Sequence, residues 1–557
     1  MSSRIAVPAV LLGALVTAIG CGGTEPNSLP QAGTGTTPSD PVTGGPGGIA
    51  TDPNAADGAA PEGSDARTCE QAAQARAYVG CDFWPTAVAN PVWSIFDFAA
   101  IVANTSGAPV DVTVTGPSGF RHTQTIAANA LGKVYLPWVP SLKQGDMDEC
   151  GGAPTTNASV IARGGAYHLV TSRPVTVYQF NALEYRGTGG PSGKNWASCA
   201  GNRVCEADGE AVGCFSFSND ASLLLPSTAM TGNYRVIGSK SGTYASTYIA
   251  ITATADGTTV EVKLWTRGGI LAGSGIPSRG AGTTATYTLD KGDVIELFAP
   301  KPSGAAISDL SGSVITASAP VQVISGVPCI TMPDATTPAC DHVEESVFPA
   351  ETLGKDYVVT VPTGPNSTPV GHVVRLVGNV DGTTLSWSRT PTGAPLTLNA
   401  GQVVDLGRVN FDFRVTGDKA FGVASLQLGA AIVDPTRDFD AKGDPSMSFP
   451  TAVEQYRDSY IFLAPTDYDV NVVDVIFPPA AESSLELDGA QLPGTAATIS
   501  GSGYMIKRVR LASTAGGTHT ITANAPIGIQ VIGYGSYTSY QYPGGLNLKH
   551  IAPPPLR

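Results

Sequence analysis

Charged side chains are scarce in this sequence. Lys, Arg, Asp and Glu make up 14% of the 557 residues, about half the share found in an average soluble protein. The net charge is −14 and no cluster of Lys or Arg stands out, which excludes the basic surface that nucleic-acid binding requires. The 66 glycines and 43 prolines indicate turn-rich structure, with polar uncharged side chains supplying the solubility.

Recognisable catalytic motifs are also missing. The sequence has no HExxH, no GxSxG, no GxxxxGK[ST] and no GxGxxG after a strand, so it lacks the signatures of common hydrolases and nucleotide-binding enzymes. It has no CxxC pair either, which argues against a zinc site. The composition therefore favours an exported binding or structural protein. No cofactor is expected, apart from the calcium possibility that the spacing of three aspartates raises below.

The N-terminus carries an export signal. Arg4 precedes an apolar run over 5–20, which suits a signal-peptide core but is too short for a membrane span. The run ends in Ala-Ile-Gly-Cys, and a small residue before a cysteine resembles the lipobox of bacterial lipoproteins. We expect residues 1–20 to be removed and Cys21 to be lipidated. An ordinary secretory signal that contains a cysteine is the alternative.

Residues 21–67 form a segment of Gly, Pro, Thr, Ser, Asp and Ala with almost no large apolar side chain. Such a segment buries too little surface to offset its chain entropy, so we expect a disordered tether. The sequence CEQAAQARAYVGC that follows at Cys69 predicts a short helix pinned by a disulfide.

Nine cysteines are present, and lipidation of one leaves eight, enough for four disulfides in an oxidising compartment. Eight cysteines allow roughly a hundred connectivities, so the pairing stays open. Local spacing favours Cys69 with Cys81, Cys205 with Cys214, Cys329 with Cys340 and, by elimination, Cys150 with Cys199.

Two phrases recur four times. An apolar residue and a proline open each unit, at Pro85, Pro226, Pro349 and Pro450. A pair of alternating runs around a turn closes each unit, with Pro174, Pro320, Ala420 and Pro526 at the turn. Four units of about 100 residues predict a tandem array of β-modules.

Turn signals within the units predict hairpins. Asp256-Gly257 and Asp381-Gly382 each separate two alternating runs, as in tight antiparallel turns. Further turns are expected at Lys291-Gly292, Ala400-Gly401 and Asp488-Gly489. About seven strands per unit favour four tandem β-sandwich-like modules in an all-β chain. The alternative is two blades per unit in a seven- or eight-bladed β-propeller.

The repeats predict where the domains begin and end. The expected boundaries are 1–20 for the signal peptide, 21–67 for the tether, 68–218 for a first module with a Cys-rich insertion, 219–340 for the second, 341–442 for the third and 443–557 for the fourth.

Six phrases in order resemble the IgGFc-binding protein N-terminal family. They are RPVTVYQFNALEY at Arg173, SNDASLLLP at Ser218, DLSGSVITASAPVQVISG at Asp309, CDHVEESVFP at Cys340, GDPSMSFPTAVEQY at Gly443 and SYQYPGGLNL at Ser539. The likeness covers 172–548. The family includes mucosal Fc-binding proteins and bacterial envelope proteins, myxobacterial lipoproteins among them. The resemblance implies a surface recognition or adhesion module without catalytic residues.

Two polar clusters are candidates for chemistry. Asp341 and His342, with Glu344 and Glu345, offer metal ligands or an acid/base pair, but a structural tie between loops is the favoured interpretation. Asp438, Asp440 and Asp444 place oxygen donors at near-alternate positions beside a glycine, a spacing that calcium sites use and that turns also show.

Two aromatic pairs, Phe83/Trp84 and Tyr540/Tyr542, suit sugar stacking or a core. The favoured function is a lipid-anchored, non-catalytic binding or adhesion protein of the bacterial outer membrane or cell surface. Its expected partner is an extracellular protein or polysaccharide, and it contacts the membrane only through its lipid. A structural envelope or matrix protein and a glycan-active hydrolase are the alternatives.

Overall fold

The computed structural model describes residues 66–146, 158–199, 214–301, 307–435, 440–512 and 517–555. These belong to one compact unit, Ala59–Arg557. Cys21, the signal peptide and the tether up to residue 65 lie outside the described residues, as do Cys150, Cys205 and Asp438.

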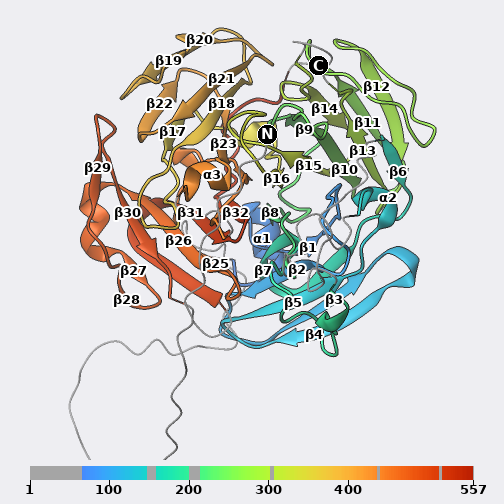
Figure 1. Cartoon of the computed structure of the whole chain (residues 1–557), viewed down its shortest axis with the longest axis horizontal. Helices are drawn as coiled ribbons and strands as arrows, with labels where there is room; N and C mark the ends of the chain where they lie inside the picture. The colour runs from blue at the N-terminus through green and yellow to red at the C-terminus, as the bar shows by residue number, and fades with distance from the viewer. Residues whose placement is uncertain are drawn as a thin grey trace, which may run out of the picture. The chain divides into compact units, whose positions relative to one another are not determined.

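Four modules of paired antiparallel sheets follow one another along the chain, from blue through green and gold to red in Figure 1. Each module has a peripheral sheet and a central sheet. In hydrogen-bonding order the peripheral sheets are β4(Arg121–Ile126)-β3(Val110–Thr115)-β7(His168–Asn181)-β1(Gly80–Phe83); β12(Thr284–Leu289)-β11(Thr258–Lys263)-β14(Val314–Ala317)-β9(Asn233–Arg235); β20(Thr397–Leu398)-β19(Thr383–Trp387)-β22(Phe413–Gly417)-β17(Asp356–Val359); and β28(Ala490–Gln491)-β27(Glu486–Leu487)-β31(Thr518–Gly535)-β25(Arg457–Leu463).

The central sheets repeat one order as well. They are β5(Ala130–Leu136)-β2(Phe98–Asn104)-β7-β8(Asp220–Leu224); β6(Val160–Ala162)-β13(Val294–Phe298)-β10(Tyr248–Ala253)-β15(Val321–Ile330)-β16(Asp341–Ser346); β21(Val403–Val409)-β18(His372–Gly378)-β23(Phe421–Gln427)-β24(Met447–Ser448); and β29(Ala497–Ile499)-β30(Tyr504–Arg510)-β26(Val470–Phe477)-β31-β32(Thr538–Pro543).

The two sheets of a module pack face to face. In the third module, Leu385 of β19 and Phe413 of β22 share one buried cluster with Leu376 of β18 and Val423 of β23. Central strands such as β10 are buried along their whole length, whereas peripheral strands such as β11 alternate buried and exposed residues. This explains why the sequences of central strands are continuously apolar, whereas those of peripheral strands alternate between apolar and polar residues. The predicted all-β array of repeated modules is confirmed.

Most of the predicted hairpins are wrong. The strands on either side of Asp256-Gly257, β10 and β11, belong to opposite sheets and do not pair. The same holds at Asp381-Gly382, Lys291-Gly292 and Ala400-Gly401, whereas Asp488-Gly489 does join the paired β27 and β28. The other four connections are arches, in which the two strands lie in opposite sheets and face each other across the core. An arch needs the same tight turn as a hairpin. Gly257, for example, has a φ of 65°, a conformation that glycine tolerates best.

The closing phrase of each unit is a strand that passes from one sheet to the other. The beginning of β7 pairs with β1 and β3, and its end, after Pro174, pairs with β2 and β8. Proline has no N–H to donate to a ladder, so it suits the point where pairing changes sheets. Pro320 and Ala420 occupy the same point between β14 and β15 and between β22 and β23.

Helices are short. The predicted helix at Cys69 is present as α1(Cys69–Ala75), and Cys69 is joined to Cys81. The other helical segments are α2(Pro140–Lys143), α3(Ala430–Val433), η1(Pro117–Gly119), η2(Trp196–Ser198), η4(Ala350–Thr352), η5(Val453–Gln455) and η6(Pro479–Ser484). Within the described ranges, no helix has the length and apolar character needed to cross a bilayer.

One disulfide differs from the expected pairing. Cys329 is joined to Cys340, as the spacing predicts, but Cys214 is joined to Cys199. The pairs that we expected for Cys199 and Cys214 were therefore wrong. The reason is a return of the chain that sequence distance does not reveal, because Gly187 donates its N–H to the carbonyl of Cys214 at 2.8 Å.

Candidate functional site

Four strands, one from each module, meet at the centre of the fold. They are β8, β16, β24 and β32, and each contacts the next in a closed ring that includes a contact between β32 and β8. We call these four strands the central ring; β8, β16 and β32 are labelled near the middle of Figure 1. Each is the edge strand of its central sheet, so the ring joins all four modules.

Asp220 of β8 links the central ring. Its carboxylate accepts N–H groups from Glu344 at 3.1 Å, Met447 at 3.0 Å and Gln541 at 3.4 Å, one from each of the other three strands. Burial raises the pKa of this carboxyl well above its ordinary value, although the N–H groups act in the opposite direction.

The polar cluster that the sequence singled out on β16 belongs to this ring and is fully buried. Glu344 accepts hydrogen bonds from Gln179 at 2.9 Å, Ser222 at 3.0 Å and Asn181 at 2.9 Å. His342 contacts the same carboxylate at 3.3 Å. These bonds run between β16 and the first module, so they favour the structural interpretation over an acid/base pair.

Two other buried acids have oxygens without partners among the described residues. Asp444 has none for either carboxylate oxygen, and Glu345 has none for Oε2. Burial raises the pKa of both carboxyls. Burial also raises the pKa of the Asp341 carboxyl, and the nearby carboxyl of Asp444 raises it further. Neutral carboxyl groups are the expected state of such acids, because an unpaired charge is costly in a buried site.

The calcium hypothesis gains no support from these positions. Asp440 is exposed and bonds to Lys442, whereas Asp444 is buried beside Asp341. Across the described part of the chain, no three His, Cys, Asp or Glu side chains are grouped to hold a metal ion.

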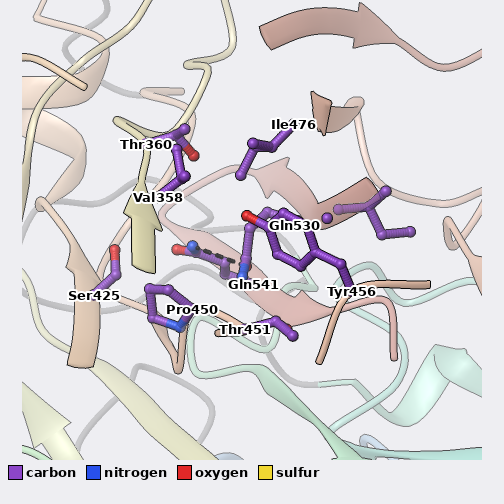
Figure 2. Close-up of a pocket in the computed structure, with 11 residues that line it drawn as sticks. Val358, Thr360, Ser425, Pro450, Thr451, Tyr456, Ile476, Gln530 and Gln541 are labelled. Carbon is purple, nitrogen blue, oxygen red and sulfur yellow. Dashed lines mark hydrogen bonds between the residues drawn. The ribbon is translucent and has the colours of Figure 1, made fainter. Parts of the chain in front are cut away.

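A small cavity lies beside the central ring. Figure 2 shows Gln541 hydrogen bonded to Gln530 on its wall, at 3.4 Å, with Tyr456 and Thr451 nearby. The Gln541 Oε1, the Thr451 hydroxyl and the Tyr456 hydroxyl have no partner among the described residues. Its volume of about 10 Å³ is about the room that one water molecule needs, so it is too small for a ligand.

A much larger cleft of about 630 Å³ lies between the second and third modules. We call it the intermodule cleft. Its polar lining comes from Arg235, Lys263, Thr266, Asn379 and Asp381. Its apolar lining comes from Leu264, Trp265, Val314, Val380, Ala400 and the C-terminal prolines Pro553, Pro554 and Pro555.

The floor of the intermodule cleft joins the two modules. Arg235 of β9 donates to the carbonyls of Gly312 at 2.8 Å and Asn379 at 3.4 Å. Beneath it, Arg375 of β18 pairs with the buried Asp309 of the second module. Burial would lower the pKa of Arg375, but Asp309 and the neighbouring Asp405 outweigh it and raise the pKa.

Two buried side chains that line the intermodule cleft are incompletely paired. Asn379 is 3% exposed and Arg235 is 4% exposed. Neither side-chain atom of the Asn379 amide, nor Nε of Arg235, has a partner among the described residues. Burial lowers the pKa of Arg235 to about 10, although Asp381 acts in the opposite direction. The sequence signal at this site is a single tryptophan, Trp265, just after the end of β11.

The aromatic pairs proposed for sugar stacking are part of the core. Phe83, Trp84, Tyr540 and Tyr542 are all at most 3% exposed, and Trp84 stacks on His168 with ring centroids 4.3 Å apart. None of the four offers a platform to a ligand in solution.

Comparisons with known proteins agree with the resemblance read from the sequence. The model of the family described as IgGFc binding protein matches residues 220–533, which is more than half of the chain and begins at β8. The human IgGFc-binding protein is 27% identical over 235 residues, which cover 42% of this chain. The match spans only 4% of the human protein's length.

Among solved structures, a tetra-tandem repeat from the extending region of a large adhesion protein aligns with 84% of this chain and 99% of its own. The identity is 11% and the TM-score is 0.08, which is too low to indicate a shared fold. The family match, together with the order of the phrases, shows that this chain belongs to the IgGFc-binding protein family.

Proposed function

We propose that this chain is a non-catalytic binding protein that recognises an extracellular protein. The family match over residues 220–533 carries the proposal, because the human relative is named for binding IgG Fc. The tandem modules add support, since loops held by a rigid β-scaffold are common binding surfaces.

Burial of the central acids supports a non-catalytic role. Asp341 and Glu344, which a glycan hydrolase would need, are fully buried and hydrogen bonded within the chain. A polysaccharide would reach them only if the central ring opened.

The proposal includes a lipid anchor at Cys21 and a tether over 21–67, which place the modules at the surface of a bacterial outer membrane. The lipobox-like end of the N-terminal apolar run supports this placement. Many anchored copies would bind multivalently, so the affinity of each contact need not be high. Mass spectrometry of the mature protein should find a diacylated N-terminal cysteine, and a Cys21→Ser variant should lack it. An unmodified Cys21 in the wild type would refute the anchor.

Binding is tested by immobilising the purified full chain and exposing it separately to IgG Fc, to a secreted-protein fraction and to envelope polysaccharide, with and without calcium. We expect saturable retention of one protein by the folded chain and none by the heat-unfolded chain. Equal retention by both, or retention only of further copies of this chain, would favour a structural envelope protein. Retention of polysaccharide alone would assign adhesion to a glycan instead.

A further inference from the structure

The intermodule cleft has the size and depth of a ligand site. Its volume of about 630 Å³ falls within the range of about 300–1,000 Å³ that is typical of binding pockets. Its rim carries the exposed Lys263, Thr266 and Asp381, and its floor carries the buried Arg235 and Asn379. The cleft is therefore lined by exposed side chains on one side and by buried side chains on the other.

The unpaired atoms at the floor specify what a ligand must offer. A buried amide without partners costs about 1–3 kcal/mol, and Asn379 leaves both a donor and an acceptor unpaired. A peptide group carries the complementary pair, a C=O and an N–H. The prolines on the wall have no N–H, so Pro553–Pro555 cannot pair with the acceptor of Asn379.

The charge of the lining adds a second requirement. The whole chain has a net charge of −14, yet this cleft is lined by two cations, Arg235 and Lys263, and one carboxylate, Asp381. The described hydrogen bonds of Arg235 go to main-chain carbonyls, and its Nε stays unpaired. An anionic acceptor is the group that best complements a buried guanidinium.

The apolar walls favour a peptide over a sugar. Leu264, Val314 and Val380 line the cleft, together with Trp265 and the prolines. Such walls desolvate apolar side chains and would leave the hydroxyl groups of a sugar unpaired. The indole of Trp265 is held in place by Gly401, where an added Cβ would lie 2.5 Å from the ring.

We infer that the intermodule cleft binds an extended acidic peptide segment of the extracellular partner. A carboxylate of the peptide accepts a hydrogen bond from Nε of Arg235, one peptide group pairs with the side-chain amide of Asn379, and an apolar side chain packs on Trp265. This inference rests on the proposed function and names the site and the chemistry through which it acts.

The test uses the full chain and a library of random octapeptides with blocked termini, so that any carboxylate is a side chain. We expect the selected peptides to share an Asp or Glu. Replacing that acid by its amide should weaken binding about tenfold or more, the effect of losing a charge-assisted hydrogen bond. Equal binding of the amide peptide, or no selected peptide, would overturn the inference.

An Asn379→Leu variant tests the floor of the cleft. It removes two unpaired polar groups and keeps the branching and the number of heavy atoms of the side chain, so the thermal midpoint should stay or rise, while peptide binding should fall about tenfold or more. Asn366→Leu is the matched control, because Asn366 is exposed on the loop between β17 and β18, and it should bind like the wild type. Unchanged peptide binding by Asn379→Leu would refute the assignment.

Two further comparisons separate this inference from the proposed function. If wild type and Asn379→Leu retain the same partner protein equally, the binding function stands and the cleft assignment fails. If peptides bind but no extracellular protein is retained, the assignment stands and the proposed function fails. A glycan array run in parallel would overturn the peptide assignment if it found a sugar whose binding is lost in Asn379→Leu.

Discussion

Buried carboxyl groups at the central ring make the stability of this fold depend on pH. The carboxyl of Glu345 illustrates this. Burial raises its pKa, the carboxyls of Asp220 and Glu344 raise it further, and the N–H groups of Ser346 and Leu223 act in the opposite direction. A raised pKa in the folded state means that the folded chain holds its proton more tightly than the unfolded chain.

The direction of the pH effect follows. Below a pH of about 4.5 both states are protonated and the contribution to stability is complete. As the pH rises, these carboxyls lose their protons first in the unfolded chain. The free energy of unfolding therefore falls until the same carboxyls also lose their protons in the folded chain. Glu296 of β13, whose pKa burial raises to about 8, contributes to stability in the same direction.

The Glu345→Gln substitution should reduce this pH dependence. The free energy of unfolding of the wild type should be larger at about pH 5 than at about pH 8.5, and the difference should shrink in the variant. Denaturant titrations at the two pH values measure it. The exposed Glu486→Gln should leave the difference unchanged. A wild type that is more stable at the higher pH would contradict the prediction.

The sequence predicts the polar residues of β16 and a structural role for them, but not the partners that they contact. The cluster at Asp341 stands out in the sequence because it is the densest group of polar residues in the chain, whereas Asp220 and Asn379 look like ordinary turn or strand-end residues. What gives those two residues their importance is contact with modules more than 100 residues away, which no local pattern encodes. Asp220, for instance, accepts the N–H of Met447.

The arches are the elements in which the structure differs most from the prediction, because hairpins were expected at the same turns. Alternating runs around Asp-Gly fit a hairpin and an arch equally, because both need a tight turn and strands of opposite direction. What separates them is whether the two strands hydrogen bond or face each other across a core. β10 is buried on both faces, and this continuous apolar character was the available signal.

Two arch glycines allow a matched test of the intermodule cleft. Gly257 and Gly401 both have positive φ, 65° and 77°, so alanine at either position costs about 1 kcal/mol. Only Gly401 has a neighbour that a Cβ would meet, the ring of Trp265 at 2.5 Å, whereas Gly257 has open space.

We therefore expect Gly401→Ala to destabilise the chain more than Gly257→Ala and to weaken binding of an acidic peptide, because it displaces Trp265. Thermal unfolding and peptide titration of the two variants measure this. Equal destabilisation by both variants would mean that the Trp265 ring is not fixed by Gly401.

The central ring implies that the four modules stabilise one another. Each module completes its central sheet with a strand that contacts the strands of neighbouring modules, and Asp220 bonds to three of them. An array of independent modules would instead unfold one module at a time.

Asp220→Ala should therefore destabilise the whole fold. Four buried N–H groups, those of Ala221, Glu344, Met447 and Gln541, lose their acceptor, and each costs about 1–3 kcal/mol when unpaired. Calorimetry should give one main transition for the wild type and a lower, broader one for the variant. Asp111→Ala, which removes an exposed acid of β3, is the control. Four separate transitions in the wild type would contradict the account.

The claim that this chain binds an extracellular protein is tested most directly by one binding measurement. The protein retained by the immobilised chain is purified and titrated against the full wild-type chain, with the selected acidic peptide as competitor. The account predicts saturable binding at one site and displacement by the peptide. Binding that does not saturate, or that the heat-unfolded chain reproduces, would contradict it.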